Sequence, residues 1–177
     1  MISDELHKSV SRLVLGHCRA QYEELSNTWR DIEHKAQGIV ALAAALLAGV
    51  FILFRSIEEP TKVVLLFFVA SMLILLVSIL FALVALVVAE VECIDDSSEI
   101  RSAGKRILEA KNNKQAKKEL RQFVFDHAKD WERICNNLHA ANTQKSSNVL
   151  KSQKWLFAGV VGVGISLTVL ILDPSVA

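Results

Sequence analysis

Three long apolar blocks interrupt an otherwise polar chain. They run from about Gly38 to Phe54, from Val63 to Ala89 and from Trp155 to Leu172, and none has an ionisable side chain in its interior. A bilayer core of about 30 Å needs about 17–25 helical residues. Only helices and closed barrels satisfy every backbone amide in lipid, so blocks this long predict three transmembrane helices. The second block is longer than needed, and we expect it to tilt or to extend beyond the lipid.

Two amphipathic stripes occupy the polar parts of the chain, with apolar side chains three, four or seven residues apart. Nothing breaks the first stripe before the first block, and no Pro or Gly interrupts the second before Gly159, so we expect each helix to continue into its span. The stripes most simply pack on each other as a helical stalk; the alternative is that part of this face binds a second subunit. Their members are Leu15, Tyr22, Leu25, Trp29, Ile32, Ala36 and Ile39 in the first, and Leu120, Phe123, His127, Trp131, Ile134, Leu138 and Ala141 in the second.

Turn and capping signals separate these helices. Pro60 indicates a tight turn between the first two blocks. After the second block, Asp96 and Glu99 stand at capping-box spacing and predict a short helix that ends near Ala110, before the Asn112–Asn113 pair.

Basic residues in the flanks predict the orientation, because cytoplasmic loops are enriched in Lys and Arg. Residues 1–36 carry five basic residues and residues 90–154 carry thirteen, whereas the turn between the first two blocks has only Arg55 and Lys62, and the tail after Leu172 has none. We therefore predict an all-α integral membrane protein with a helical cytoplasmic stalk, the N-terminus in the cytoplasm and the C-terminus outside. Its parts are a cytoplasmic amphipathic helix (1–36), a transmembrane hairpin (37–91), a cytoplasmic helical region (92–153) and a third span with a short tail (154–177).

Small residues at four-residue spacing mark one face of the first block and one face of the third. Such faces let helices approach closely in lipid, where no hydrophobic drive brings helices together. Packing within one chain and contact between copies both remain open, and the two faces could also meet each other. The candidates are Ala41, Ala45 and Gly49 in the first block and Ala158, Gly162 and Ser166 in the third.

The only polar side chains at depth are hydroxyls, which commonly bond the backbone of their own helix: Ser71, Ser78, Ser166 and Thr168. A charge inside a span usually marks an ion or proton path. Its absence here argues against an ion-coupled transporter, and any pore has to be assembled from several copies.

A basic run lies in the cytoplasmic region and is offset only by Glu109 and Glu119. A solvated face that sets topology is the simplest interpretation; anionic lipid headgroups are the functional alternative, and a soluble phosphate ligand would lack a glycine-rich cradle. Nucleic acid is not expected, since no aromatic residues interleave with the charges. The candidates are Lys111, Lys114, Lys117, Lys118 and Arg121.

Composition adds little chemistry to this picture. The chain is 52% apolar with a net charge of +1, and its three cysteines (Cys18, Cys93 and Cys135) are too few and too widely spaced for a disulfide framework. Cys135 and His139 stand four residues apart but lack a third and fourth ligand, so no metal site is predicted. No catalytic constellation and no cofactor motif is present, and we do not expect an enzyme.

Two segments resemble a known group of proteins. Residues 29–38, from Trp29 to Gly38, lead into an Ala-rich span, and a helix through Trp131 continues past Asn142 and Lys145 to a further span. This layout resembles the small bacterial transmembrane effectors of nucleotide-signalled antiphage defence, of the Pycsar type, and the related SLATT proteins. It departs from them in having no separate cyclic-nucleotide-binding domain, and from the two-span SLATT layout in having a third span.

The resemblance implies an effector that oligomerises in the inner membrane and impairs its integrity when a nucleotide signal or a partner protein reports infection. The alternative function is a membrane-anchored subunit that recruits or regulates a cytoplasmic partner through the 92–153 region.

Overall fold

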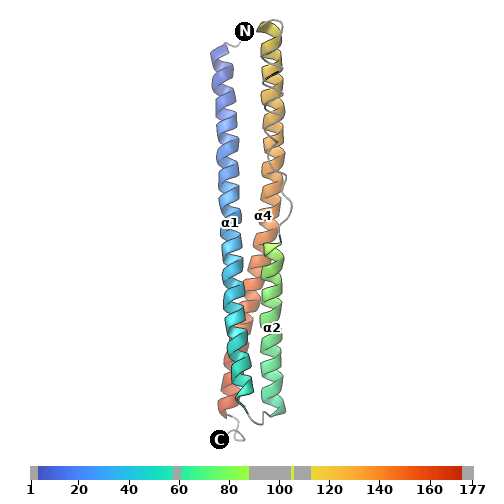
Figure 1. The fold of residues 1–177 in the computed structure, drawn as a ribbon. Coiled ribbons are helices and arrows are strands. Elements are labelled where there is room, and N and C mark those ends of the chain that lie inside the picture. The colour runs from blue at the N-terminus through green and yellow to red at the C-terminus, as the bar shows by residue number, and fades with distance from the viewer. Residues whose placement is uncertain (1–3, 58–60, 88–104, 106–112, 173–177) are drawn as a thin grey trace. The chain divides into compact units, whose positions relative to one another are not determined.

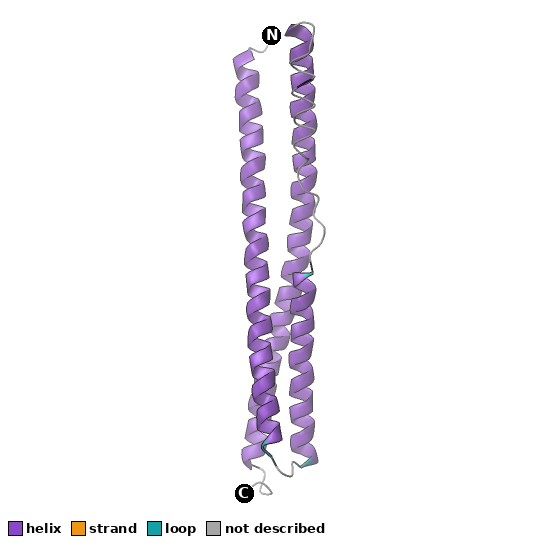
Figure 2. Ribbon diagram, viewed as in Figure 1, coloured by secondary structure: helices purple, strands orange, loops and turns teal. Residues whose placement is uncertain are grey.

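The chain folds into long helices. In a computed structural model, which describes residues 4–57, 61–87, 105 and 113–172, the helices are α1 (Asp4–Arg55), α2 (Lys62–Leu86) and α4 (Asn113–Leu172) (Figure 1). Figure 2 shows no strand in these described ranges. All three helices are long enough and apolar enough to cross a membrane. The predicted all-α fold with three such helices is therefore confirmed.

The helix boundaries follow the sequence signals closely. α1 and α4 each run without a break from a polar stretch into an apolar block, as predicted. α2 begins after Thr61, whose hydroxyl accepts a hydrogen bond of 3.4 Å from the Val64 amide, and ends at Leu86 because Val87 takes an extended conformation. The predicted apolar block extended to Ala89. The predicted Pro60 turn, the capping box and the short helix before Asn112 lie outside the described residues.

The chain divides into two compact units. Unit 1 comprises Met1–Thr28 and Ala89–Ala141, and unit 2 comprises Trp29–Val88 and Asn142–Ala177. α1 and α4 contribute residues to both units, whereas α2 belongs to unit 2.

Unit 1 joins α1 to α4 through aromatic side chains. The ring of Tyr22 meets the ring of Trp131 edge-on, with 5.6 Å between centroids. On α4, His127 stacks on Phe123 and meets Trp131 edge-on. Edge-to-face and offset-stacked rings are the favoured arrangements of aromatic pairs. The two predicted stripes therefore do pack on each other here, and His127 is one of the packed rings.

Unit 2 brings together α2 and the later parts of α1 and α4, as Figure 1 shows. One apolar cluster takes Ile32, Ala36 and Ile39 from α1, Ala82 and Ala85 from α2, and Val149 from α4. A second cluster contains Val50, Val64 and Phe68. Both clusters combine residues of neighbouring helices, as expected for side-by-side helix packing.

The buried positions of α2 repeat alternately every four and three residues: Val64, Phe68, Ser71, Leu75, Ser78, Ala82 and Ala85. This is the spacing of left-handed helix packing, in which one seam keeps facing the partner helices. The same spacing relates Asn142, Lys145, Val149 and Ser152 on α4. Because α2 is apolar on all sides, its sequence alone did not reveal which face is buried.

Two glycines let α4 approach α2 closely. A Cβ atom placed on Gly159 would lie 2.6 Å from Leu75 Cδ2, and one placed on Gly162 would lie 2.8 Å from Ser71 Oγ. A side chain at either position requires Leu75 or Ser71 of α2 to move. A Cβ atom on Gly164 would meet nothing within 4 Å.

Replacing Gly162 by valine should therefore separate α4 from α2. We expect Gly162→Val to lower the free energy of unfolding in detergent by about 1–3 kcal/mol, the usual cost of overpacking a close contact. Gly164→Val is the matched control, because it makes the same change on the same helix in open space. Equal stabilities of the two variants would contradict the observed α2–α4 contact.

Candidate functional site

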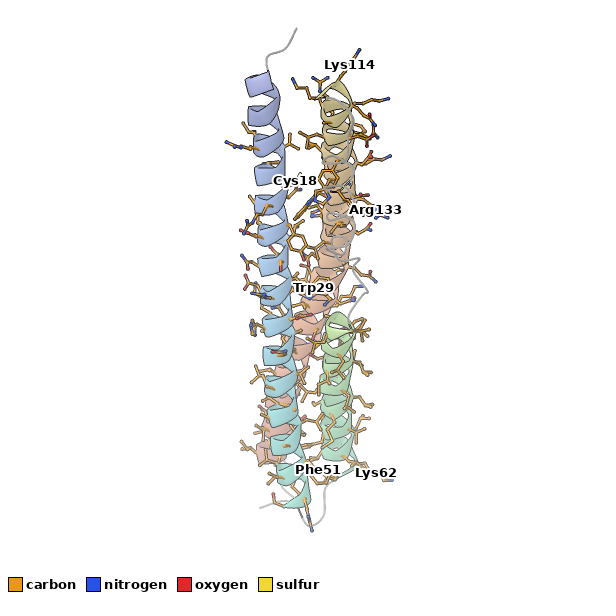
Figure 3. All side chains as sticks on the ribbon, turned by 45° about the horizontal axis from the view of Figure 1, so that its top comes forward. Cys18, Trp29, Phe51, Lys62, Lys114 and Arg133 are labelled. Atoms are coloured by element: carbon orange, nitrogen blue, oxygen red, sulfur yellow. The ribbon has the colours of Figure 1, made fainter. Side chains whose placement is uncertain are left out.

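The most unusual side chain in unit 2 is a buried lysine. Lys145 on α4 is only 5% exposed, and its Nζ donates to Glu33 Oε1 on α1 over 2.8 Å. The same ammonium lies 3.4 Å from the centroid of the Trp29 ring, and Trp29 is labelled on α1 in Figure 3. The Lys145 charge is thus held between a carboxylate and an aromatic face, which are the two kinds of group that compensate for lost hydration.

This arrangement joins α1 to α4 and requires one relative position of the two helices. Burying a charge is costly unless it is paired. Sliding either helix by one turn would separate Lys145 from Glu33 or from Trp29, which are themselves one turn apart on α1. Asn142, one turn before Lys145, is also buried. We infer that this polar layer fixes how α1 and α4 align within unit 2.

Serine pairs join α2 to α4. Ser78 Oγ donates to the Ser152 carbonyl over 2.9 Å, and Ser152 Oγ donates to the Ser78 carbonyl over 2.7 Å. Further along, the hydroxyls of Ser71 and Ser166 lie 3.2 Å apart and are in contact across the two helices, while each has a carbonyl of its own helix within donating distance. Hydroxyls that bond across helices hold apolar helices together where water is absent.

The prediction that hydroxyls at depth bond their own helix is confirmed for three of the four. Ser71 donates to the Phe67 carbonyl, Ser166 to the Gly162 carbonyl and Thr168 to the Gly164 carbonyl. For Ser78 it was wrong, because that hydroxyl donates to the neighbouring helix. The prediction did not consider Ser152 on α4, which exchanges hydrogen bonds with Ser78.

The two small-residue faces have different surroundings. On α4, Gly162 lies against Ser71 and Ser166 is buried, while Ala158 is half-buried. On α1, Ala41 and Ala45 are exposed, Gly49 is half-buried, and a Cβ atom on Gly49 would meet nothing within 4 Å. The α4 face is thus used within the chain, whereas the α1 face remains available.

Four of the predicted basic candidates lie together. Lys114, Lys117, Lys118 and Arg121 line one hollow of about 550 Å³ with Gln115, and Figure 3 labels Lys114 near the beginning of α4. Lys111 lies outside the described residues. Unit 1 has a second hollow of about 500 Å³, lined in part by Cys18, Phe125, Trp131 and Cys135.

The two thiols of that second hollow differ in environment. Cys18 is half-buried and Cys135 is buried, and both are free. Burial raises the pKa of the Cys135 thiol, and the nearby Cys18 raises that pKa further. No group of three or more His, Cys, Asp or Glu side chains that could hold a metal ion occurs among the residues that the structure describes.

If the spacing of the second amphipathic stripe is continued along α4, it reaches most of the α4 residues that are buried in unit 2. Four- and three-residue steps beyond Leu138 reach Asn142, Lys145, Val149 and Ser152 in turn. Three of these four are polar, so the pattern of hydrophobicity is lost while the geometric spacing continues. The partner of Lys145 could not be read in this way, since Glu33 is 112 residues away along the chain.

Comparison of the chain with protein-family models, with curated proteins and with solved structures found no match.

Removing the Lys145 ammonium should destabilise unit 2. Lys145→Met leaves the Glu33 carboxylate, which is 29% exposed, without its partner, and we expect a loss of about 1–3 kcal/mol in the free energy of unfolding. Lys35→Met is the control, because Lys35 lies on the same helix as Glu33 and its side chain is exposed. Its free energy of unfolding should stay close to that of the wild type.

A double-mutant cycle separates the ion pair from packing. The double variant Glu33→Gln/Lys145→Met should lose less free energy of unfolding than the two single variants lose together. In the double variant neither position carries a charge that lacks its partner. Strict additivity would show that the Glu33–Lys145 contact contributes no coupling.

Cys135 should react with maleimide at least about tenfold more slowly than Cys18 at neutral pH, since the thiolate is the nucleophile. A raised pKa leaves less thiolate at a given pH, so the Cys135 rate should keep rising at pH values above the ordinary range of a cysteine. The measurement uses two single-cysteine chains, Cys18→Ser/Cys93→Ser and Cys93→Ser/Cys135→Ser. Equal rates at neutral pH would contradict the burial of Cys135.

Proposed function

We propose that the chain is a three-span protein of the bacterial inner membrane, with its N-terminus and residues 92–153 in the cytoplasm and its C-terminus outside. The observation that supports this most is the inverted polarity of unit 2. Ser71, Ser78 and Ser166 are buried between helices, whereas large apolar side chains such as Phe157, 72% exposed, and Leu66, 68% exposed, point outward. Lipid accommodates such a surface, and water does not.

Within that membrane, the proposed function is that of an effector. Copies of the chain associate and impair the integrity of the bilayer in antiphage defence. The sequence resemblance of residues 29–38 and of the Trp131–Lys151 segment to nucleotide-signalled effectors supports this proposal. The uncharged spans support it too, because a path for ions or water then has to form between copies.

The α1 face of Ala41, Ala45 and Gly49 is the proposed contact between copies. Small residues allow close helix approach in lipid, and Ala41 and Ala45 are exposed, whereas Gly162 and Ser166 on α4 lie against Ser71 of α2. A nucleotide signal or a partner protein would act from the cytoplasm, through the polar region of the chain.

A second function, that of a membrane-anchored subunit recruiting a cytoplasmic partner, is favoured by a specific observation in unit 1. Leu13 and Phe125 are 74% and 68% exposed although neither lies in an apolar block. Phe125 also borders the hollow of about 500 Å³. Exposed large apolar groups beside a hollow are typical of a protein-binding surface.

The two functions predict different results on induction in bacterial cells. As an effector, the wild-type chain should admit a membrane-impermeant dye, and Ala41→Leu/Ala45→Leu should reduce dye entry at least about tenfold by preventing close helix contact. Self-association, measured by energy transfer between labelled copies in the membrane, should fall in parallel.

Ala70→Leu is the matched control, because Ala70 is an exposed small residue on α2; it should behave like the wild type. Intact membranes with the wild-type chain under activating conditions would reject the effector proposal. Recovery of a specific cytoplasmic partner in that case, lost on Phe125→Ser, would favour the second function.

A further inference from the structure

The last turns of α2 expose a patch of large apolar side chains. Leu80, Leu83, Val84 and Val87 are 60%, 45%, 54% and 69% exposed. Positions three, four and seven residues apart share one side of a helix. The four side chains therefore form one surface, which we call the inner α2 patch. The other side of the same turns packs within the chain.

Contacts within unit 2 show which parts of the other two helices lie beside this patch. Ser78 exchanges hydrogen bonds with Ser152 of α4. Ala85 shares an apolar cluster with Val149 of α4 and Ile32 of α1. Residues of α2 after Ser78 thus lie alongside residues of α4 before Ser152, so the two helices run antiparallel. The patch ends nine residues after Ser78, which is roughly 13 Å further along the helix axis.

The surfaces of α1 and α4 beside the patch are polar. The apolar block of α4 begins only at about Trp155, and that of α1 at about Gly38. Charged side chains are costly within hydrocarbon, so this level of unit 2 lies outside it. An exposed apolar patch with polar surroundings is typical of a binding surface. The exposed residues beside it, of which all but Leu150 are polar, are Asp31, His34, Lys35 and Gln37 on α1, and Gln144, Ser146, Ser147, Leu150 and Lys151 on α4.

The patch continues along α2 into the lipid as one row of exposed residues. This row has steps of three, four, three and four residues, the spacing with which one helix keeps facing another over several turns. Leu75, near its start, lies against Gly159 inside the apolar block of α4. A soluble protein would reach only the patch, whereas a membrane-spanning helix covers the whole row. Its members, which we call the α2 row, are Leu73, Leu76, Leu80, Leu83 and Val87.

We propose that the α2 row is the contact with a second copy of this chain, α2 against α2. Copies that insert by the same charge rule have the same orientation and depth. Equal residues then meet at equal levels in a parallel pair with a twofold axis, and each inner α2 patch covers the other. With the proposed α1 contact, each copy has two contact faces, and association extends beyond a pair. The inference rests on the proposed membrane insertion and not on the effector role.

Single cysteines test the contact directly. The full chain, with its three native cysteines replaced by serine, is oxidised with copper phenanthroline in alkali-washed cell membranes. Leu80→Cys should form a disulfide between copies, because equal positions of such a pair lie within the separation of about 6 Å between Cα atoms that a disulfide spans. Phe67→Cys is the control, since Phe67 is exposed on α2 outside the α2 row. Its disulfide yield should be at least about fivefold lower.

A charge exchange separates loss of pairing from loss of fold. In a chain with Leu73→Cys, the change Leu80→Lys/Leu83→Lys should lower the disulfide yield at least about tenfold, because like charges then meet. Leu80→Glu/Leu83→Glu should do the same. Coexpression of the two variants, distinguished by tags of different size, should restore a mixed disulfide. Gln144→Lys/Ser147→Lys is the control, because it adds the same charge at exposed positions of α4, and it should leave the yield unchanged.

The proposal is supported if Leu80→Cys forms the disulfide and the mixed charge pair restores it. It is overturned if the chain is in the washed membranes but Leu80→Cys yields no more disulfide than Phe67→Cys, since lipid or another protein then covers the patch. Failure of the mixed pair also overturns it. A chain that is washed off the membranes overturns the proposed insertion as well. The Leu80→Cys disulfide should persist with Ala41→Leu/Ala45→Leu; its loss there would assign the pairing to α1 alone.

Discussion

The arrangement of unit 2 depends on where its polar groups can find partners. Where water is absent, a hydroxyl or an ammonium has to be satisfied by protein. Ser78 and Ser152 satisfy each other across two helices, and Lys145 is satisfied by Glu33 and Trp29. These contacts have direction and few alternatives, whereas the surrounding Leu, Val and Phe side chains pack acceptably in many ways. The polar contacts thus select one alignment of the helices from many of similar apolar packing.

Close approach of backbones supports these polar contacts. A serine side chain is short, so Ser71 and Ser166 come within 3.2 Å only where the helix axes are near each other. Gly159 and Gly162 allow that approach, since a methyl group there would collide with the Leu75 or the Ser71 side chain of α2. In unit 2 the glycines and the serines therefore act together: removing the space would also separate the hydroxyls.

The same reasoning distinguishes the two small-residue faces. The α4 face is completed by α2 within the chain, but Ala41 and Ala45 on α1 are exposed, without such a neighbour among the residues that the structure describes. In a bilayer, an exposed small-residue face gains more from a second helix than from lipid, because close packing and backbone contacts become available. Association of copies through α1 would thus extend the principle that organises unit 2.

The sequence alone determined the helices, their continuity and the stripe that joins Tyr22 to Trp131, because hydrophobic periodicity is a local property that each segment carries by itself. It also located four basic residues near the beginning of α4 that line one hollow, Lys114, Lys117, Lys118 and Arg121. Only the tertiary structure decided which face of α2 is buried, since an entirely apolar helix has no periodic contrast from which to choose. The pairing of Lys145 with Glu33 and of Ser78 with Ser152 was likewise decided there, because a partner distant along the chain is specified by helix alignment and not by local spacing.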